Sequence, residues 1–405
     1  MEKPPRTPSP LRIAFVADDL YPGYGGQAVS TEGHAGALLE RGHEVRALAG
    51  AERSPTEPPG VAVERLPAWR PSNKQIHYAF PVRRKVLALA NWADVIHINT
   101  PTPLALLTLR AAHRANVPAL LGFHAQEESM TMHTGRLILP FLRGWYRFIY
   151  LMPDALVAPT PFAARLASRY TRRPVHVVSN GIRLPETGPA DRERAAALRG
   201  RLLGGKRFLI SHVGRLSQEK RPQSLLELMA PLAAHRTDTR LIVAGDGPLR
   251  KMLERRRARL GLTDTVSFLG YIPEDEKQDL LRASDLFLIP SPVELQSIAT
   301  LEAMAHGCPV VAAGHDSSAV PEIVREADAG RVYDPDHLPK AAAEIENLLD
   351  LPDELRRFGE NAARAAKGHD IREAGRHLEE IYRNLIQARY EARREPESRK
   401  IPRDC

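Results

Sequence analysis

The chain has 405 residues, 43% of them hydrophobic, which is enough for two domains, and its two cysteines, Cys308 and Cys405, exclude a disulfide framework and argue against a zinc site. No apolar run is long enough to cross a membrane, and Ile13–Ala17 is too short for the core of a signal peptide, so we expect neither a membrane span nor secretion. Residues 1–190 carry 22 Lys and Arg against 14 Asp and Glu, whereas residues 191–405 carry 35 of each, so the whole net charge of +8 lies in the first half.

Short apolar runs recur along the chain, and each is followed by a turn and a helical pattern. Strands that are apolar throughout and alternate with helices are typical of parallel sheets covered on both faces. The predicted strands are Ile13–Ala17, Val45–Leu48, Val95–Ile98, Ala119–Phe123, Ala155–Ala158, Phe208–Val213, Leu241–Ala244, Val266–Phe268, Leu286–Ile289 and Val310–Ala312. These two series predict an α/β protein with two Rossmann-like domains facing across a cleft.

The domain limits follow from composition. Residues 182–206 are rich in turn residues and charge, as linkers are. We expect an N-terminal domain over 1–186 and a C-terminal domain over 187–370. Residues 371–405 are expected to hold an amphipathic helix that crosses back towards the first domain, followed by a tail.

Ligands of open parallel sheets bind beyond the carboxyl ends of the strands, so chemistry is sought in the turns there. In the first domain, Gly25 and Gly26 allow close backbone approach to a phosphate or a sugar. His124 follows the fourth strand at the same edge. For His97, inside the third strand, we favour a structural role.

A second feature of the first domain is the aromatic and basic segment 130–150. On a helical wheel Arg136, Arg143 and Arg147 fall on one side and bulky apolar residues fill the rest. The pattern suits either an interfacial helix on anionic lipid or ordinary core packing. Pro140 and Gly144 argue against one straight helix, although Pro140 could begin one.

A further basic cluster, Arg83-Arg84-Lys85, could cooperate in membrane binding or be a solvated helix face. No nucleic-acid-binding module is recognisable, so no nucleic-acid partner is expected. We therefore expect a cytoplasmic protein, with peripheral binding to the inner face of the cell membrane left open.

Two cations follow the first strand of the second domain. Arg215 and Lys220 flank the start of a helix, where charge and free backbone N–H groups suit a diphosphate, although two solvated surface charges would give the same pattern. Gly247 belongs to the tight turn Gly245-Asp246-Gly247-Pro248 after the next strand. Tyr271, after the third strand, could flank a planar base or simply pack.

The segment after Leu286–Ile289 carries two carboxylates. Ser297 is expected to cap a helix over Ile298–His306 that Gly307 ends. Glu294 then lies before the helix and Glu302 in its second turn. Such an arrangement fits one elongated ligand, with carboxylates for hydroxyl groups at its ends and N–H donors for a diphosphate between them.

Four motifs in this order resemble the retaining glycosyltransferases of family 4, which have the GT-B fold. They are Asn180-Gly181-Ile182, Gly214-Arg215-(four residues)-Lys220, Gly245-Asp246-Gly247-Pro248, and Glu294-(seven residues)-Glu302 followed by AMAHGCPVV. The resemblance covers nearly the whole chain. It implies that a hexose passes from a nucleotide-diphosphate sugar to an acceptor, and that no metal or other cofactor is needed because Arg215 and Lys220 take its place.

The resemblance also implies roles for individual residues. His124, Arg215, Lys220 and Glu294 would be catalytic, Glu302 would contact the ribose, and Glu294 the sugar. The implied donor-binding residues are Gly25, Gly26, Arg215, Lys220, Gly247, Tyr271, Ile272, Glu294, Leu295, Gln296, Ser297, Ile298 and Glu302. The favoured mechanism is front-face displacement, with neither Asp18 nor Asp19 assigned as a nucleophile.

One departure bears on the acceptor. Gln296-Ser297 stands where the family often has Phe-Gly, and a Gln there resembles the branch that glycosylates diacylglycerol. A membrane lipid is therefore the favoured acceptor, and a soluble sugar or small molecule the alternative. A non-catalytic sugar-nucleotide-binding protein or an epimerase of the same fold also stays open.

Two other enzyme classes fit the sequence less well. The stretch Gly23–Ala28 satisfies a loose dinucleotide-binding pattern, but it begins too far after the strand for a nicotinamide enzyme. Asp334-Pro335-Asp336 has the letters of a metal-binding pair, but it follows both Glu residues and is interpreted as a turn.

Overall fold

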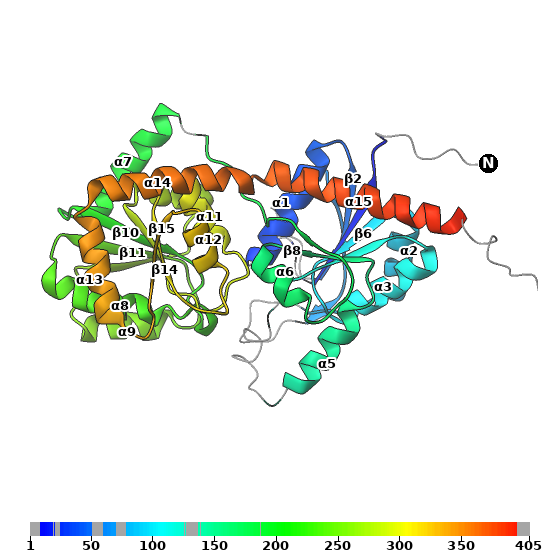
Figure 1. The fold of residues 1–405 in the computed structure, drawn as a ribbon, viewed down its shortest axis with the longest axis horizontal. Helices are drawn as coiled ribbons and strands as arrows, with labels where there is room; N and C mark the ends of the chain where they lie inside the picture. Colours follow the sequence, from blue (N-terminus) through cyan, green and yellow to red (C-terminus); the bar gives the residue numbers. More distant parts are fainter. Residues whose placement is uncertain are drawn as a thin grey trace, which may run out of the picture. The chain divides into compact units, whose positions relative to one another are not determined.

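A computed structural model describes residues 9–18, 20, 25–50, 60–69, 78–124, 126, 137, 139–186 and 188–394 of the chain. The chain divides into two compact units (Figure 1). Unit 1 comprises residues 1–125, 139–181 and 371–405, and unit 2 comprises residues 126–138 and 182–370. The boundary between the units thus falls between residues 181 and 182, whereas the sequence predicted it after residue 186.

Unit 1 is built on a seven-stranded parallel sheet of order β3-β2-β1-β6-β7-β8-β9. Its strands are β1 Arg12–Ala17, β2 Glu44–Ala49, β3 Ala62–Arg65, β6 Val95–Ile98, β7 Ala119–Gly122, β8 Ala155–Ala158 and β9 Val175–Val177. A small antiparallel pair, β4 Ala68–Trp69 and β5 Tyr78–Ala79, lies beside it. The helices are α1 Gly26–Glu40, α2 Arg83–Trp92, α3 Pro103–Ala115, α5 Leu139–Tyr150, α6 Pro161–Ala167 and α15 Ile371–Arg394.

Alternation along β1 assigns helices to the two faces of this sheet. Ile13, Phe15 and Ala17 belong to one core with side chains of α1 and α15. Ala14 and Val16 are equally buried but point the other way, where α2 and α3 pack on β1. Both faces are therefore covered, as the uniformly apolar strands predict.

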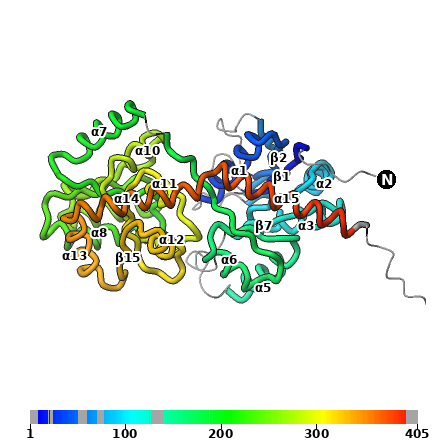
Figure 2. Tube along the Cα trace, turned by 45° about the horizontal axis from the view of Figure 1, so that its top comes forward, coloured from blue at the N-terminus to red at the C-terminus, as the bar shows by residue number. Residues whose placement is uncertain are grey.

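The helix α15 is held against unit 1 by small residues and ion pairs, and it lies beside α1 in both views (Figure 2). A side chain on Gly375 would place its Cβ 2.8 Å from Cβ of Ala37, so the backbones of α15 and α1 approach closely. Glu379 accepts from Arg41 at 2.6 Å, and Arg389 pairs with Asp154 at 2.7 Å. The amphipathic helix expected within residues 371–405 is therefore present, as Ile371–Arg394.

Unit 2 contains a six-stranded parallel sheet of order β12-β11-β10-β13-β14-β15. Its strands are β10 Phe208–Val213, β11 Thr239–Ala244, β12 Val266–Gly270, β13 Leu286–Ile289, β14 Val310–Ala313 and β15 Gly330–Tyr333. Its helices are α7 Pro189–Leu203, α8 Gln223–His235, α9 Arg250–Arg259, α10 Glu274–Ala283, α11 Ile298–Ala305, α12 Val320–Glu326, α13 Leu338–Leu349 and α14 Pro352–Ala366, with the 3₁₀ turns η2 Gln218–Lys220 and η3 Lys367–His369. All ten strands predicted from the sequence are present.

The prediction of a linker over residues 182–206 is wrong for most of its length, because α7 occupies it. Pro189 suits the first turn of a helix, and the Asp191 carboxylate accepts from the N–H of Gly188 at 2.9 Å, which caps the helix. Ala195 and Leu198 are buried in a core shared with α10. Turn residues and charge in this stretch therefore mark a capped surface helix.

The tight packing of α15 on α1 leads to a test with two alanine substitutions. Gly375→Ala should lower the unfolding free energy of unit 1 by about 1–3 kcal/mol, because Cβ of Ala37 cannot move away from the added methyl. Gly36→Ala, in α1, meets nothing within 4 Å and should raise it by about 0.5–1 kcal/mol. All 3 Trp lie in unit 1, so urea unfolding followed by tryptophan fluorescence reports this unit. Equal effects of the two substitutions would contradict the packing described.

Candidate functional site

The strand order of unit 2 creates a switch point between β10 and β13. From β10 the chain proceeds to β11 and β12 on one side, and from β13 to β14 and β15 on the other. Ligands of open α/β sheets bind outside the carboxyl ends of the strands at such a point. The turns that begin after Val213 and Ile289 therefore form the candidate site of this unit.

These two turns are joined by an ion pair. Lys220, at the end of η2, donates to Glu294 with Nζ to Oε1 at 2.7 Å. The Glu294 side chain is 10% exposed and that of Lys220 is 29% exposed, so the pair is largely removed from water. The structure thus brings together two residues that are 74 positions apart in the sequence.

Arg215 lies in the same turn as Lys220 and is half-buried. Among the residues that the structure describes, its guanidinium has no hydrogen-bond or ion-pair partner. A half-buried guanidinium without a partner is a strong donor set for an anion.

The glycine turn after β11 packs against the turn after β10. A Cβ on Gly245 would lie 1.9 Å from the carbonyl oxygen of Gly214, and one on Gly247 would lie 2.5 Å from that of Leu216. Leu216 also donates its N–H to the Asp246 carbonyl at 3.0 Å. The close contact between the two turns is therefore sufficient reason for glycine at both positions. A contact of Gly247 with a ligand stays a prediction.

The helix α11 begins as the sequence predicts. Ser297 caps it, with Oγ accepting from the N–H of Thr300 at 3.3 Å, and Ser297 has the left-handed φ of 71°. Such a φ is uncommon for a residue other than glycine and concentrates at functional sites. Gln296 is buried, and its amide lies 3.4 Å from Nδ1 of His369. Leu295 to Ile298 thus form a fixed turn at the positive end of the helix.

Glu302, in the second turn of α11, is held by a lysine that the sequence analysis missed. Lys277 of α10 donates to Glu302 Oε1 at 2.8 Å. Burial raises the pKa of the Glu302 carboxyl, and the positive charge of Lys277 offsets part of that rise. No sequence signal marks this pair, because only the packing of α10 against α11 brings the two residues together.

The aromatic side chain expected near a base is exposed. Tyr271 follows β12 and is 84% exposed, so its ring is available to a ligand. Ile272 is half-buried and packs against the core beneath α10. The two neighbours thus differ, with Tyr271 available for contact and Ile272 fixing the loop.

At the carboxyl edge of the unit 1 sheet, Asp18 organises the loops. Its carboxylate accepts from the hydroxyls of Thr100 and Thr102, each at 2.6 Å, and from the N–H of Ala79 at 2.8 Å. With three donors and nearly complete burial, this carboxylate joins β5 to the turn after β6. Asp19, the other acid of this loop, lies outside the described residues.

The switch point of unit 1 lies between β1 and β6, and α1 begins there. Gly25 precedes the helix with φ of 114°, a conformation that favours glycine, and Gly26 is its first residue. The N–H groups of the first turn of α1 have no partner within the helix. This end of α1 is therefore suited to a phosphate or hydroxyl group.

His124 and His97 of unit 1 are in different situations. His124, after β7, is half-buried, and burial lowers its pKa to about 4, so its ring is neutral near pH 7. No described residue hydrogen-bonds its ring. His97 is fully buried between Phe15 and Tyr382, whose hydroxyl lies 2.6 Å from Nδ1, as its expected structural role requires.

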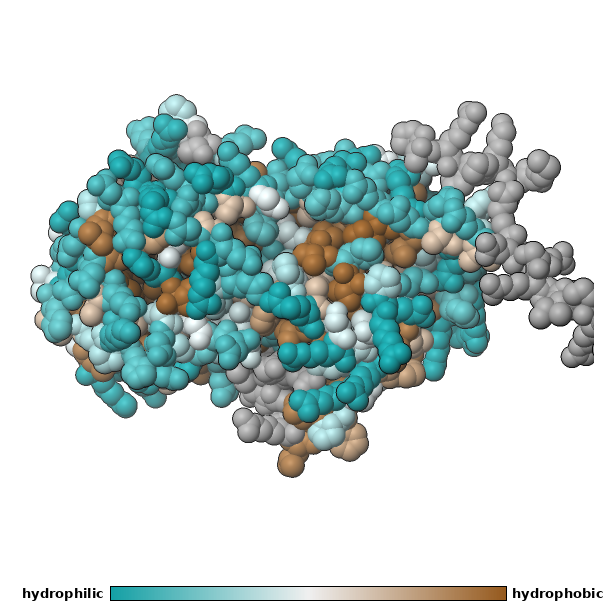
Figure 3. Space-filling view, viewed as in Figure 1, coloured by the Kyte–Doolittle hydropathy of each residue, from teal (hydrophilic) through white to brown (hydrophobic). Residues whose placement is uncertain are grey.

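The helix α5 exposes apolar side chains. Phe141 is 80% exposed, Leu137 just before the helix is 91% exposed, and Phe148 and Leu151 are nearly half exposed. Brown side chains gather over α5 at the lower end of the molecule in the space-filling view (Figure 3). Arg143 and Arg147 are exposed on the same helix, and Arg136 lies outside the described residues. The helix α5 begins at Leu139, so Pro140 lies in its first turn, and it continues through Gly144 without a break.

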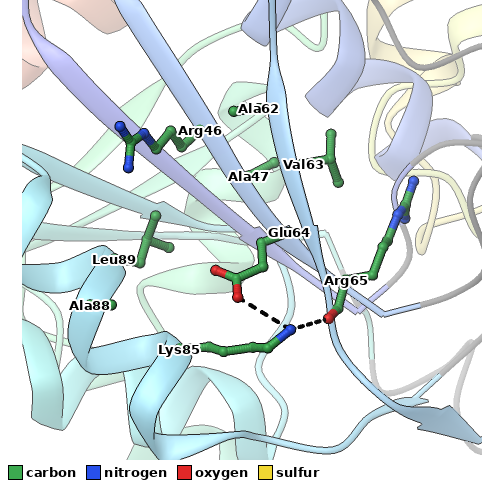
Figure 4. Close-up of a pocket in the computed structure, with 9 residues that line it drawn as sticks. All are labelled: Arg46, Ala47, Ala62, Val63, Glu64, Arg65, Lys85, Ala88 and Leu89. Carbon is green, nitrogen blue, oxygen red and sulfur yellow. Dashed lines mark hydrogen bonds and ion pairs between the residues drawn. The ribbon is translucent and has the colours of Figure 1, made fainter.

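The basic cluster at the start of α2 is only partly free. Arg83 and Arg84 are exposed, but Lys85 donates to the carbonyl of Arg65 at 2.7 Å and pairs with Glu64 at 3.2 Å. This pair lines a cavity of about 570 Å³ between β3 and α2 (Figure 4). Lys85 is therefore less suited to membrane binding than Arg83 and Arg84, because its charge is already paired with Glu64.

Neither a membrane span nor a metal-ligating cluster occurs in the described part of the chain. Within the ranges given above, no helix is long and apolar enough to cross a membrane. The same ranges hold no group of three His, Cys, Asp or Glu side chains arranged around a metal ion. Asp334 and Asp336 form an exposed turn in which the carboxylate of Asp334 accepts from the N–H of Asp336 at 2.9 Å, so the interpretation as a turn is confirmed.

Two family models match the chain in tandem. The model of Glycosyltransferase Family 4 matches residues 24–185, and that of Glycosyl transferases group 1 matches residues 195–365. The alpha-monoglucosyldiacylglycerol synthase of Streptococcus pneumoniae is 27% identical over 358 residues, which are 85% of this chain and 79% of that protein. A GDP-mannose-dependent alpha-(1-6)-phosphatidylinositol dimannoside mannosyltransferase of Mycobacterium tuberculosis is 33% identical over 206 residues, 50% of this chain and 51% of the relative.

The fold is also found among solved structures. HepE of Anabaena in complex with UDP superposes with a TM-score of 0.75 at 23% identity, covering 92% of this chain and 100% of that one. The same protein in complex with UDP-glucose gives a TM-score of 0.73 at 22% identity. The expected fold class, an α/β protein of two Rossmann-like domains with the GT-B fold, is confirmed.

The contact between the two turns at the switch point can be tested by one methyl group. Gly247→Ala should destabilise unit 2 by about 1–3 kcal/mol and weaken the binding of UDP or GDP, because the carbonyl of Leu216 would be displaced. Gly200→Ala in α7, which meets nothing within 4 Å, should leave binding unchanged. Unfolding is followed by far-UV circular dichroism and binding by titration calorimetry. Normal stability and affinity in Gly247→Ala would show that the turns do not pack in this way.

Proposed function

We propose that this chain, which belongs to the glycosyltransferases, moves a hexose from a nucleotide-diphosphate sugar to a membrane lipid with retention at the anomeric carbon. The chain has a Glycosyltransferase Family 4 domain followed by a group 1 domain, in the GT-B fold. The activity of a glycosyltransferase follows from the family. The observation that carries the proposal for the donor is the Lys220–Glu294 pair at the switch point, beside Arg215, whose guanidinium no described residue engages.

The donor would lie along the turn before α11. The guanidinium of Arg215 and the ammonium of Lys220 bind the two phosphates, and the N–H groups of Leu295 to Ile298 add donors at the positive end of the helix. Glu302 accepts hydrogen bonds from the ribose and Glu294 from the hexose. Tyr271, exposed after β12, borders the base, and Ile272 holds its loop.

Donor binding exchanges the partners of Lys220. Without ligand, its ammonium is neutralised by Glu294 at 2.7 Å. A diphosphate carries more charge than a carboxylate, so it displaces Glu294 from Lys220 and leaves Glu294 available for sugar hydroxyls. One ion pair thereby couples the recognition of the diphosphate to that of the hexose.

The chemical step is a front-face displacement at the anomeric carbon. The acceptor oxygen forms a bond to that carbon as the bond to the diphosphate oxygen breaks, and the acceptor proton passes to the departing diphosphate. Arg215 and Lys220 stabilise the charge on the leaving group, which is the role a divalent metal would otherwise take. His124, neutral because of burial, offers the sugar a hydrogen-bonding group without adding charge.

The proposal of a lipid acceptor is supported by the position of the apolar and basic groups in unit 1. Helices between parallel strands run antiparallel to them, so α2 and α5 both begin at the carboxyl edge of the sheet. Exposed Phe141, together with Arg83 and Arg84, therefore lies at the edge where Gly25 and His124 also lie. Apolar side chains next to arginines suit the interface of an anionic membrane, here the inner face of the cell membrane.

Two relatives support the same acceptor class. The Streptococcus protein is described as a synthase of a glucosyldiacylglycerol, and the Mycobacterium protein acts on a phosphatidylinositol dimannoside. Gln296, buried in the turn before α11, is the residue by which the sequence resembled the diacylglycerol branch. A soluble acceptor would need neither the exposed face of α5 nor the arginines of α2.

The donor assignment predicts the effect of removing one cation. Lys220→Met should lower kcat by a factor of about 100 to 1,000, because the leaving group loses a charged donor. The buried Glu294 carboxylate also loses its ion-pair partner, so the unfolding temperature should fall, and kcat is measured where circular dichroism shows the variant folded. Lys251→Met, an exposed lysine of α9, is the matched control and should be unaffected. Release of UDP or GDP from a panel of nucleotide sugars measures the rate. Full activity of Lys220→Met would remove this residue from the mechanism.

The acceptor assignment predicts membrane binding through α5. The double substitution Leu137→Ser and Phe141→Ser should lower the partition of the protein onto phosphatidylcholine–phosphatidylglycerol vesicles at least about tenfold, since each apolar side chain contributes about 1.5–3 kcal/mol when buried. Met252→Ser with Leu260→Ser, exposed apolar residues of unit 2, is the control. Arg147→Glu should weaken binding only when the anionic lipid is present. If the wild-type protein sediments neither with these vesicles nor with vesicles of phosphatidylcholine alone, the soluble acceptor is favoured instead.

A further inference from the structure

We propose that Lys277 is a positioning residue for the donor, which holds the Glu302 carboxylate charged and oriented for the ribose hydroxyls. The inference rests on the proposed function, because it takes the ribose as the ligand of Glu302. It goes further by assigning a residue on α10, outside the motifs by which the site was found.

The contacts around Lys277 leave it a single arrangement. Its Nζ lies 2.8 Å from Glu302 Oε1 and 2.9 Å from Glu274 Oε2, and its side chain is only 17% exposed. Glu274 also accepts from the amide of Gln278 at 2.7 Å, and the amide oxygen of Gln278 lies 2.6 Å from Nε2 of His306. The ammonium is thus held between two carboxylates by groups from both α10 and α11.

Burial makes this pair different from a surface ion pair. The Glu302 side chain is 12% exposed, so without a cation nearby it would tend to take up a proton. For Lys277, burial by itself would lower the pKa, but Glu302 and Glu274 outweigh that effect and raise it. Lys277 is therefore charged at neutral pH, and its charge favours the ionised form of Glu302.

The ionised form is the one that donor binding needs. A carboxylate can accept two hydroxyl hydrogen bonds, whereas a protonated carboxyl group has lost part of that capacity. Lys277 engages Oε1 and Gln278 also hydrogen-bonds the carboxyl, so the carboxylate cannot rotate freely. Each carboxylate oxygen has two acceptor positions, and those that Lys277 and Gln278 leave open remain for the ligand. Hydrogen bonds to a fixed charged group are stronger than those to a neutral one.

Lys340 and Glu344 provide a comparison inside the same unit. This lysine–glutamate pair of α13 is exposed, with Nζ and Oε1 at 3.9 Å and side-chain exposures of 76% and 45%. Exposed pairs of this kind contribute little and are screened by salt. Comparing UDP binding after removal of each lysine distinguishes the effect of losing any lysine of this unit from the effect of losing the one that holds Glu302.

The experiment measures the affinity of the full chain for UDP and for 2′,3′-dideoxy-UDP between pH 5.5 and 8.5, with GDP and its analogue if only GDP binds. Lys277→Met should weaken UDP binding at least about tenfold at neutral pH, because the ribose hydroxyls lose a hydrogen bond to a charged Glu302 carboxylate. The loss should grow as the pH falls, since the pKa of Glu302 rises further without its cation. Binding of the dideoxy analogue should change little, Lys277→Arg should restore most of the UDP affinity, and Lys340→Met should have no effect.

Glu302→Gln distinguishes the two possible failures. If Glu302→Gln weakens UDP binding while Lys277→Met does not, the proposed donor site stands and the role of Lys277 is wrong. If Glu302→Gln has no effect on UDP, the ribose assignment itself is wrong. The double variant Lys277→Met/Glu302→Gln should bind UDP no worse than Glu302→Gln alone, and it keeps the test valid if Lys277→Met alone unfolds. Additive losses in the double variant would show that Lys277 acts independently of Glu302.

Discussion

The ion pair between Lys220 and Glu294 is the contact on which the proposed donor site of unit 2 depends. It joins the turn after β10 to the turn after β13 at the point where the strand order of the sheet reverses. Parallel strands place the turns at their carboxyl ends along one edge, so residues distant in sequence become neighbours there. The pair also neutralises two charged groups that are largely removed from water, which a ligand-free site of this kind requires.

A second lysine–glutamate pair, Lys277 with Glu302, repeats this arrangement farther along the same segment. In both pairs the glutamate is the more buried partner, and in both Nζ and Oε1 are within 2.8 Å. The two pairs are expected to respond differently to a bound donor. Lys220 lies in the turn beside Arg215 and can change partner to a diphosphate, whereas Lys277 is fixed between Glu274 and Glu302.

The sequence predicted the interior of this fold better than its edges. Buried strands such as β1 and β13 are apolar at nearly every position, and these were found. Three of the four strands at the edges of the two sheets, β3, β9 and β15, are short and partly exposed, so their mixed sequences carry no clear pattern and they were not predicted. The fourth, β12, was found from its apolar start. The helix α7 was hidden by the turn residues and charges that cap it.

The candidate site shows the same limit. Arg215, Lys220, Glu294 and Glu302 could be named from motifs, because each follows a strand at a recognisable spacing. Lys277 could not, since its contact with Glu302 arises from the packing of two helices and no spacing encodes it. Lys85 was placed on an open basic surface, but Glu64 and the backbone of Arg65 engage it. Tertiary contacts of long, flexible side chains are not written in a local pattern.

The two glutamates are assigned to different parts of one donor, and titration calorimetry with UDP and UDP-glucose separates them. We predict that Glu294→Gln weakens the binding of UDP-glucose but not of UDP, and that Glu302→Gln weakens both by the same factor. If Glu294→Gln weakened UDP as much as UDP-glucose, or if neither substitution altered either affinity, the two carboxylates would not share one nucleotide sugar and the central claim would be contradicted.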